Sequence, residues 1–144
     1  MLKPTNTNYL FKFSIVTAVY NVEAYLSEAI DSILSQDIGF LESVELILVD
    51  DGSTDASGAI CDEYQHKYPE NIVVIHKPNG GVASARNAGI AVARGRYVNF
   101  MDSDDKLTPD TLSSVYDFFI EHDKEVDLVS VPIFYFEQKN EPHR

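Results

Sequence analysis

Runs of apolar and β-branched residues alternate along the chain with segments in which apolar residues recur at helical spacing. The first run, Phe13–Tyr20, is apolar on both faces, which is typical of a strand inside a parallel sheet. Three later runs have the same character: Val44–Val49, Ile72–His76 and Arg96–Met101. A fifth run, Asp127–Phe136, contains Pro132, so we expect an edge, bulged or broken strand there.

Apolar residues at helical spacing predict helices between these strands. The expected helices span about Val22–Gln36, Asp55–Tyr68, Val82–Ala93 and Pro109–Asp123. Thr108 is the expected N-cap of the last helix, with Pro109 at its first position, and residues 37–43 are expected to form a loop. The alternation predicts an α/β fold with right-handed crossovers, a mostly parallel Rossmann-like sheet and helices on both faces.

The composition narrows the class of protein. A chain of 144 residues can form one domain with a real core, and a net charge of −12 opposes binding to nucleic acid or to an anionic membrane surface. A phosphate ligand stays open, because a divalent cation can bridge phosphate to carboxylate. The single cysteine, Cys61, fits a small core residue better than a nucleophile. The four histidines lack metal-binding spacing, and no apolar run has the length of a membrane span.

Acidic residues follow two of the predicted strands, in Asp50–Ser53 and in Asp102–Asp105. Ligands of open α/β sheets bind beyond the carboxyl ends of the strands, and carboxylates there can hold a hard cation. Tight or solvated turns are the plain structural alternative for both segments. An EF-hand is excluded, because Lys106, Leu107 and Ser113 stand at its ligand, glycine and glutamate positions.

Three further features are candidates at the same edge. Gly80 and Gly81 precede a helix and can seat a phosphate, although they match neither standard glycine-rich fingerprint. Arg86 lies in an alanine-rich helix and needs either an acidic partner or an anionic ligand, and both remain open. Tyr20 ends the first strand as a core aromatic or, alternatively, as a platform on which a base stacks.

Five segments together resemble, in order and spacing, the family 2 glycosyltransferases of the GT-A fold. They are Ser14–Asn21, Ser32–Gln36, Glu45–Asp55, Asn79–Gly89 and Gly95–Asp105. The resemblance implies inverting transfer of a sugar from a nucleoside diphosphate donor, commonly a UDP-sugar, with Mg²⁺ or Mn²⁺. The acceptor would be a saccharide or a lipid-linked molecule. The enzyme would act in bacterial polysaccharide synthesis, in the cytoplasm or at the inner face of the membrane.

The resemblance also implies roles for individual residues. The nucleotide-sugar-binding positions would be Ala18, Tyr20, Asp50, Asp51, Arg86, Asp102 and Ser103, and the metal-binding positions Asp104 and Asp102. Tyr20 would lie against the base, Asp51 would bond its edge and Asp50 would support that loop. Arg86 would lie near the diphosphate or its carboxylates. Many relatives have proline at the position of Ala18.

The general base of such a transfer lies, in this family, on a later segment. We therefore expect residues 1–144 to be a single domain, the donor-binding half of an enzyme, with the base beyond Arg144. The alternative is a non-catalytic nucleotide-binding or regulatory α/β module, which capping of the acids by Lys106 or Arg96 would favour. A phosphoacceptor domain is disfavoured, because the last strand offers no lysine. The apolar stretch Val126–Phe136 leaves a homodimer open.

Overall fold

In the computed structural model, which describes residues 9–129, the strands form one parallel sheet of order β3-β2-β1-β4. The strands are β1 (Phe11–Val19), β2 (Val44–Asp50), β3 (Ile72–His76) and β4 (Gly95–Phe100). The helices are α1 (Leu26–Leu34), α2 (Phe40–Ser43), α3 (Ser57–Lys67), α4 (Val82–Val92) and α5 (Thr111–Glu121).

β1 lies in the interior of the sheet, with β2 on one side and β4 on the other. Val16 of β1 is opposite Ile47 in β2 and Phe100 in β4. The chain winds outward from β1 to β3 and then returns to place β4 on the free side of β1. Such a reversal of strand order is where ligands of open α/β sheets bind, so the loops after β1, β2 and β4 are the segments to inspect.

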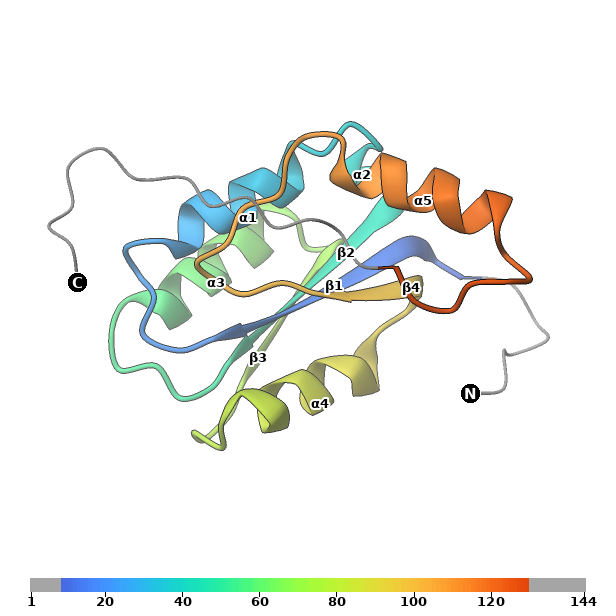
Figure 1. Cartoon of the computed structure of the whole chain (residues 1–144). Helices are drawn as coiled ribbons and strands as arrows, with labels where there is room; N and C mark the ends of the chain where they lie inside the picture. The colour runs from blue at the N-terminus through green and yellow to red at the C-terminus, as the bar shows by residue number, and fades with distance from the viewer. Residues whose placement is uncertain (1–8, 130–144) are drawn as a thin grey trace, which may run out of the picture.

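Strand alternation divides the core into two layers, one on each face of the sheet (Figure 1). The larger layer lies under α1, α3 and α5 and includes Phe13, Leu46 and Leu112. The smaller layer lies under α4 and includes Val16 and Ile47. Val16 is three positions after Phe13 and Ile47 is one position after Leu46, and an odd separation along a strand places side chains on opposite faces. The predicted parallel sheet with helices on both faces is therefore confirmed.

A buried polar cluster joins the strands at the end opposite the acidic segments. Glu45 is fully buried and accepts hydrogen bonds from Ser14 Oγ at 2.7 Å, from Arg94 N at 2.8 Å and from Arg94 Nε at 2.7 Å. Ser14 Oγ in turn accepts from Gly95 N at 2.7 Å. A buried carboxylate is tolerated only when its oxygens are paired in this way. The cluster ties β1, β2 and the start of β4 to one another.

Some boundaries differ from the sequence prediction. α1 begins at Leu26 rather than near Val22, and the short helix α2 lies inside the predicted loop at residues 37–43. α5 begins at Thr111 with Asp110 as its N-cap, so the assignment of Thr108 and Pro109 to the helix start was wrong. Residues 127–129 form no strand, and the rest of the predicted strand 127–136 lies outside the described residues.

Within residues 9–129, the longest helices are too short and too polar to traverse a lipid bilayer.

Candidate functional site

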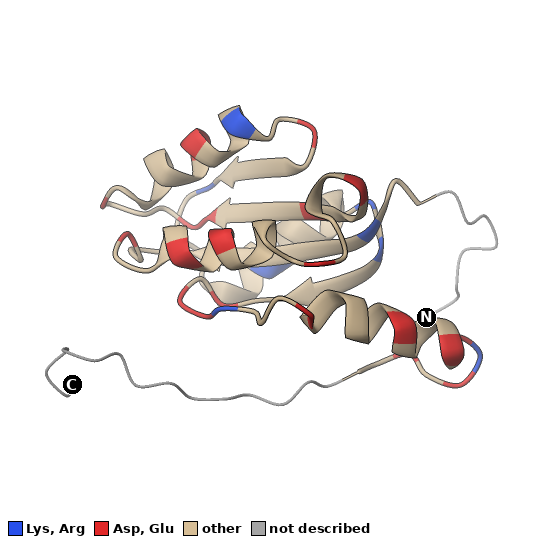
Figure 2. Ribbon diagram, turned by 90° about the horizontal axis from the view of Figure 1, so that it is seen from above, with Lys and Arg blue, Asp and Glu red and all other residues tan. Residues whose placement is uncertain are grey.

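The two acidic segments lie at the same end of the sheet, the end toward which the strand arrows point (Figure 2). β2 and β4 both run parallel to β1 and flank it, so their carboxyl ends meet on either side of the end of β1. Asp50 and Asp51 stand at the end of β2, and the acidic loop, residues 101–110, follows β4. The predicted convergence of the two segments is confirmed.

The Asp50 side chain points toward α3, and hydrogen bonds on that face of the sheet fix its carboxylate. Its Oδ2 lies 2.8 Å from His76 Nδ1, and its Oδ1 accepts from Ser53 N at 3.0 Å. The other ring nitrogen of His76 lies 2.8 Å from Asp62 Oδ1 on α3. Burial alone would raise the pKa of Asp50, but the hydrogen bonds from Ser53 and His76 outweigh it and lower that pKa. Asp50 is therefore an ionised support for the loop that follows β2.

Asp51, one residue later, points to the α4 face, as strand alternation requires. Its side chain is only 5% exposed, and its carboxylate accepts from Lys77 Nζ, Gly80 N and Gly81 N, each at 2.9 Å. The hydrogen bond from Lys77 is the main cause of the lowered pKa of Asp51, and the two backbone N–H groups add to it against the opposing effect of burial. These protein contacts alone hold the Asp51 carboxylate charged and fixed.

The loop after β1 is joined to the loop after β2 through Asn21. Asn21 has a φ of +48°, a left-handed conformation that asparagine tolerates better than most residues. Its Oδ1 accepts from Thr54 N at 2.8 Å and from Asp55 N at 3.3 Å, and its own N donates to Ser53 Oγ at 3.1 Å. The adjacent Tyr20 is 50% exposed, so it is a surface aromatic at the strand ends rather than a core residue.

The acidic loop gathers three carboxylates. Asp102, Asp104 and Asp105 are exposed and each offers an oxygen within 4.8 Å of the others. Burial, followed by the neighbouring charges of Asp102 and Asp104, raises the pKa of Asp105. Ser103, which lies between Asp102 and Asp104 in the sequence, is buried. Several carboxylate oxygens within a few ångströms match the hard-oxygen coordination of Mg²⁺, Mn²⁺ or Ca²⁺, so the residues present fit a divalent cation.

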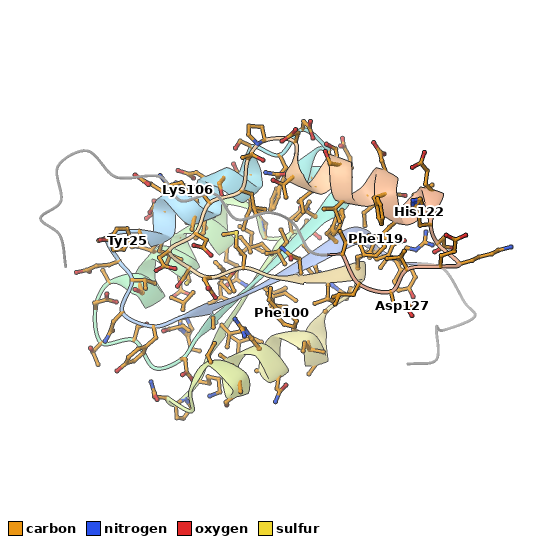
Figure 3. The ribbon with its side chains drawn as sticks, in the orientation of Figure 1. Tyr25, Phe100, Lys106, Phe119, His122 and Asp127 are labelled. Atoms are coloured by element: carbon orange, nitrogen blue, oxygen red, sulfur yellow. The ribbon has the colours of Figure 1, made fainter. Side chains whose placement is uncertain are left out.

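Arg86 finds an acidic partner in the acidic loop. Its Nη2 lies 3.3 Å from Asp102 Oδ1, and its guanidinium carbon lies 5.5 Å from the centre of the Phe100 ring. Figure 3 shows Phe100 between β4 and α4. The Arg86 and Asp102 side chains are 41% and 62% exposed, so this single long contact leaves the guanidinium available to an anion. The last predicted position, Ala18, is partly buried on the α4 face.

Lys106 and Arg96 each have an acidic partner outside the acidic loop. Capping of the loop's carboxylates by these two residues was the arrangement that would favour a non-catalytic module. Lys106 pairs with Glu28 of α1, and Figure 3 places Lys106 above that helix. Arg96 pairs with Asp123 at 2.9 Å, beyond the end of α5. Each therefore binds at least one carboxylate outside the acidic loop.

Sequence reasoning missed His76 and Lys77, which bind the two aspartates of β2 from opposite faces. The available signal was their position, since one ends a predicted strand and the other follows it at the same sheet edge. Cys61 behaves as predicted. It is fully buried, and burial raises the pKa of its thiol to about 12.

Comparison with known proteins gives consistent matches. Residues 14–144 match the family described as "Glycosyl transferase family 2". The minor teichoic acid biosynthesis protein GgaB of Bacillus subtilis (strain 168) is 50% identical over 136 residues, which cover 94% of the chain and 15% of GgaB. The crystal structure of S. aureus TarS 1-349 in complex with UDP is 33% identical, with a TM-score of 0.72, over 85% of the chain and 38% of the TarS chain.

A mannosyltransferase from Pyrobaculum calidifontis, in complex with GDP-Man and Mn²⁺, superposes with a TM-score of 0.69 over 78% of the chain and 33% of its own. At 23% identity this likeness shows the shared fold alone. The chain spans between 15% and 38% of the length of these three relatives. The predicted GT-A fold is confirmed by the TarS superposition and by the sheet itself. With its family pattern running from residue 14 to residue 144, the chain belongs to glycosyl transferase family 2.

Proposed function

We propose that the chain binds the sugar donor of an inverting glycosyltransferase, which transfers a sugar from a nucleoside diphosphate to an acceptor hydroxyl with help from Mg²⁺ or Mn²⁺. The observation that carries the proposal is the pairing of two carboxylate-bearing loops across the end of β1. One holds the fixed carboxylate of Asp51 on the α4 face, and the other presents three exposed carboxylates close together. The first suits a nucleobase and the second suits a metal diphosphate.

Asp104 and Asp102 are the proposed metal ligands, and Asp105 extends the cluster. A bound cation would neutralise the charge that develops on the diphosphate leaving group. Arg86 would contact the same diphosphate, because its only described carboxylate contact, to Asp102, is long and exposed. Asp102 would then face both the metal and the ribose, and buried Ser103 would hold the turn between the two metal ligands.

Tyr20 and Asp51 are the proposed base contacts. The half-exposed ring of Tyr20 supplies a stacking surface beside Ala18 and the end of β1. A carboxylate has about four acceptor positions, and Asp51 uses three of them, two on Oδ1 and one on Oδ2. The fourth suits one ring N–H, such as the imide of uracil. Lys77 donates to Asp51 Oδ1 and Pro78 O, and its third proton is suited to a neighbouring base carbonyl.

A UDP-sugar is the proposed donor, since TarS structures are known with UDP and with UDP-GlcNAc. The sugar and the acceptor, saccharide or lipid-linked, stay predictions. So do the division into a donor-binding half with its general base beyond Arg144, the cytoplasmic or inner-membrane location, and the homodimer. The pairing of Arg96 with Asp123, outside the acidic loop, weakens one support for a non-catalytic module.

Calorimetric titration of UDP tests the proposal, with Mn²⁺ and then with EDTA. Asp104→Asn removes one charge from the cluster without changing its shape. Asp117→Asn, on the exposed surface of α5, removes the same charge away from the site and is the matched control. We expect Mn²⁺-dependent UDP binding in the wild type and in Asp117→Asn, weakened at least about tenfold in Asp104→Asn.

Equal binding by the Asp104 and Asp117 variants would refute the metal role of Asp104. Titration with CDP separates the base proposal from the metal proposal, because cytosine presents an acceptor in place of the imide N–H. Asp51 should therefore favour UDP over CDP, and this preference should disappear in Asp51→Asn.

A further inference from the structure

The acidic loop does not end in solvent but runs back along α1 before entering α5, as the orange segment of Figure 1 shows. Three backbone groups in this return path bind α1 or the residues just after it. Leu107 N donates to Ser32 Oγ at 3.1 Å, Asp37 N donates to Pro109 O at 2.8 Å, and Thr108 O accepts from Gln36 Nε2 at 2.7 Å. The C-terminal end of α1 is thus the anchor of the loop.

Gln36 is the central residue of this anchor. Gln36 is only 4% exposed, and both the nitrogen and the oxygen of its carboxamide form hydrogen bonds. Nε2 donates to Thr108 O at 2.7 Å and to Ser32 O at 3.0 Å, while Oε1 accepts from Leu112 N at 3.0 Å. Because one end must donate and the other must accept, neither a carboxylate nor an apolar side chain satisfies all three partners.

Gln36 also replaces the missing side-chain cap of α5. The N-cap residue Asp110 makes no capping hydrogen bond with its side chain, and Thr108 bonds Asp110 Oδ1 and Thr111 Oγ1 instead. The N–H group of Leu112, at the second position of the helix, is one that a capping side chain normally satisfies. Gln36 satisfies it from the segment just after α1, so the start of α5 is fixed relative to the end of α1.

The carboxylates of the cluster therefore lie between two fixed points. At one end, Met101 N donates to Val16 O at 3.2 Å and continues the pairing of β4 with β1. At the other, Gln36 holds Thr108 and Leu112. We propose that Gln36 is a positioning residue, which holds the acidic loop so that Asp102 and Asp104 reach one cation together. The inference rests on the proposed donor site.

The physical reason is the cost of ordering. Without the Gln36 side chain, the segment after Asp105 would keep its contacts at Leu107 and Pro109 but lose those at Thr108 and Leu112. Metal binding would then have to order the part of the loop that is loosened. Residues that hydrogen-bond metal ligands directly typically contribute a factor of about 10 to 100 in metal affinity. Gln36 acts one step farther out, through Thr108 and Leu112, so its effect belongs at the lower end of that range. We therefore expect Gln36→Met to weaken the binding of Mn²⁺ in the presence of UDP by about tenfold. Uridine binding in EDTA should not change, because Tyr20 and Asp51 are held by other loops.

Asn71 provides a matched control. It is also 4% exposed, and its amide donates to the carbonyls of Phe40, Leu41 and Val44 at 3.2, 2.9 and 2.9 Å. Asn71→Leu removes a buried amide of the same kind, before β3 and outside the acidic loop. Both variants should lower the urea midpoint of unfolding, but only Gln36→Met should lower Mn²⁺ affinity. Should Gln36→Met fail to fold, Gln36→Asn keeps the amide and withdraws it by one methylene.

Hydrogen exchange gives a second readout in metal-free protein. The amide of Leu112 should lose protection in the Gln36 variants and keep it in Asn71→Leu. Unchanged Mn²⁺ affinity in a folded Gln36 variant, or an equal loss in Asn71→Leu, would overturn the inference. Absence of Mn²⁺-dependent UDP binding in the wild type would overturn the proposed metal site, and this inference with it.

Discussion

Replacing Gly89 with alanine is expected to destabilise the protein, although alanine is the better helix former. Gly89 lies in α4 where the helix crosses β1, and a Cβ there would come within 2.3 Å of Val16 Cγ1 and 3.2 Å of Val16 Cγ2. The closer approach is 1.1 Å short of the 3.4 Å at which ordinary contact begins. Val16 is buried and its branched side chain is stiff, so it cannot turn away freely.

Two opposing effects set the magnitude. Alanine in place of glycine inside a helix stabilises by about 1 kcal/mol. Forcing a methyl group into a packed core costs about 1–3 kcal/mol, and a 2.3 Å approach belongs at the upper end. The expected net loss is about 2 kcal/mol in the free energy of unfolding, which lowers the urea midpoint by about 1 M at an m-value of about 2 kcal/mol/M.

A double-variant cycle with Val16→Ala isolates the contact. That change deletes the two carbons that a Cβ at position 89 would approach most closely and leaves Val16 Cβ at an ordinary 3.4 Å. Gly89→Ala should then stabilise by about 1 kcal/mol, a coupling of about 3 kcal/mol. Urea unfolding followed by circular dichroism measures all four proteins. Asn87→Ala, at an exposed position of α4, should raise stability by up to about 0.7 kcal/mol in both backgrounds. The reasoning is refuted if the coupling is below about 0.5 kcal/mol.

Three further predictions concern buried or paired groups. Cys61 should resist alkylation at pH 8 in folded protein and react in urea, whereas rapid labelling of native protein would contradict its burial and its pKa of about 12. Glu45→Ala should cost about 3 kcal/mol in urea unfolding, because it leaves its three donors without an acceptor. The hydrogen bond to Asp50, followed by the one to Asp62, raises the pKa of His76 above 6.5. The stability that protonated His76 contributes is therefore fully present below pH 6.5 and is lost as the pH rises through the raised pKa. Thermal unfolding should accordingly show the advantage of the wild type over His76→Gln shrinking above pH 6.5; a constant difference would count against the pairing.

The strands and most helices could be predicted because their signals are local. A run such as Val44–Val49 is apolar at every position but one, and the exception, Glu45, is buried with its own donors. The acidic loops were found for the same reason, since they directly follow such runs. The start of α5 was misplaced because Thr108 and Pro109 look like a helix start, and the actual cap comes from Gln36, in the segment after α1.

The contacts within the site were the part that could not be predicted. Lys77 reaches Asp51 across 26 positions in the chain, and Gln36 reaches Leu112 across 76. Such pairs depend on which strands become neighbours, and the order β3-β2-β1-β4 is a property of the assembled sheet. Arg86 illustrates the limit. Its need for an acidic partner or an anionic ligand was evident from its helix, but the contact with Asp102 required the fold.

The buried cluster around Glu45 has a consequence for the far end of the sheet. It fixes Gly95 against β1, where Gly95 pairs with Phe11, and thereby sets how far β4 is advanced along its neighbour. A slip by one residue would turn Tyr97 out of its core face. A slip by two would keep every face correct but move Asp102 by about 6.6 Å, several times the length of a metal–oxygen bond. The axial position of the carboxylates is therefore determined by polar contacts at the opposite end of the sheet, away from the proposed donor site.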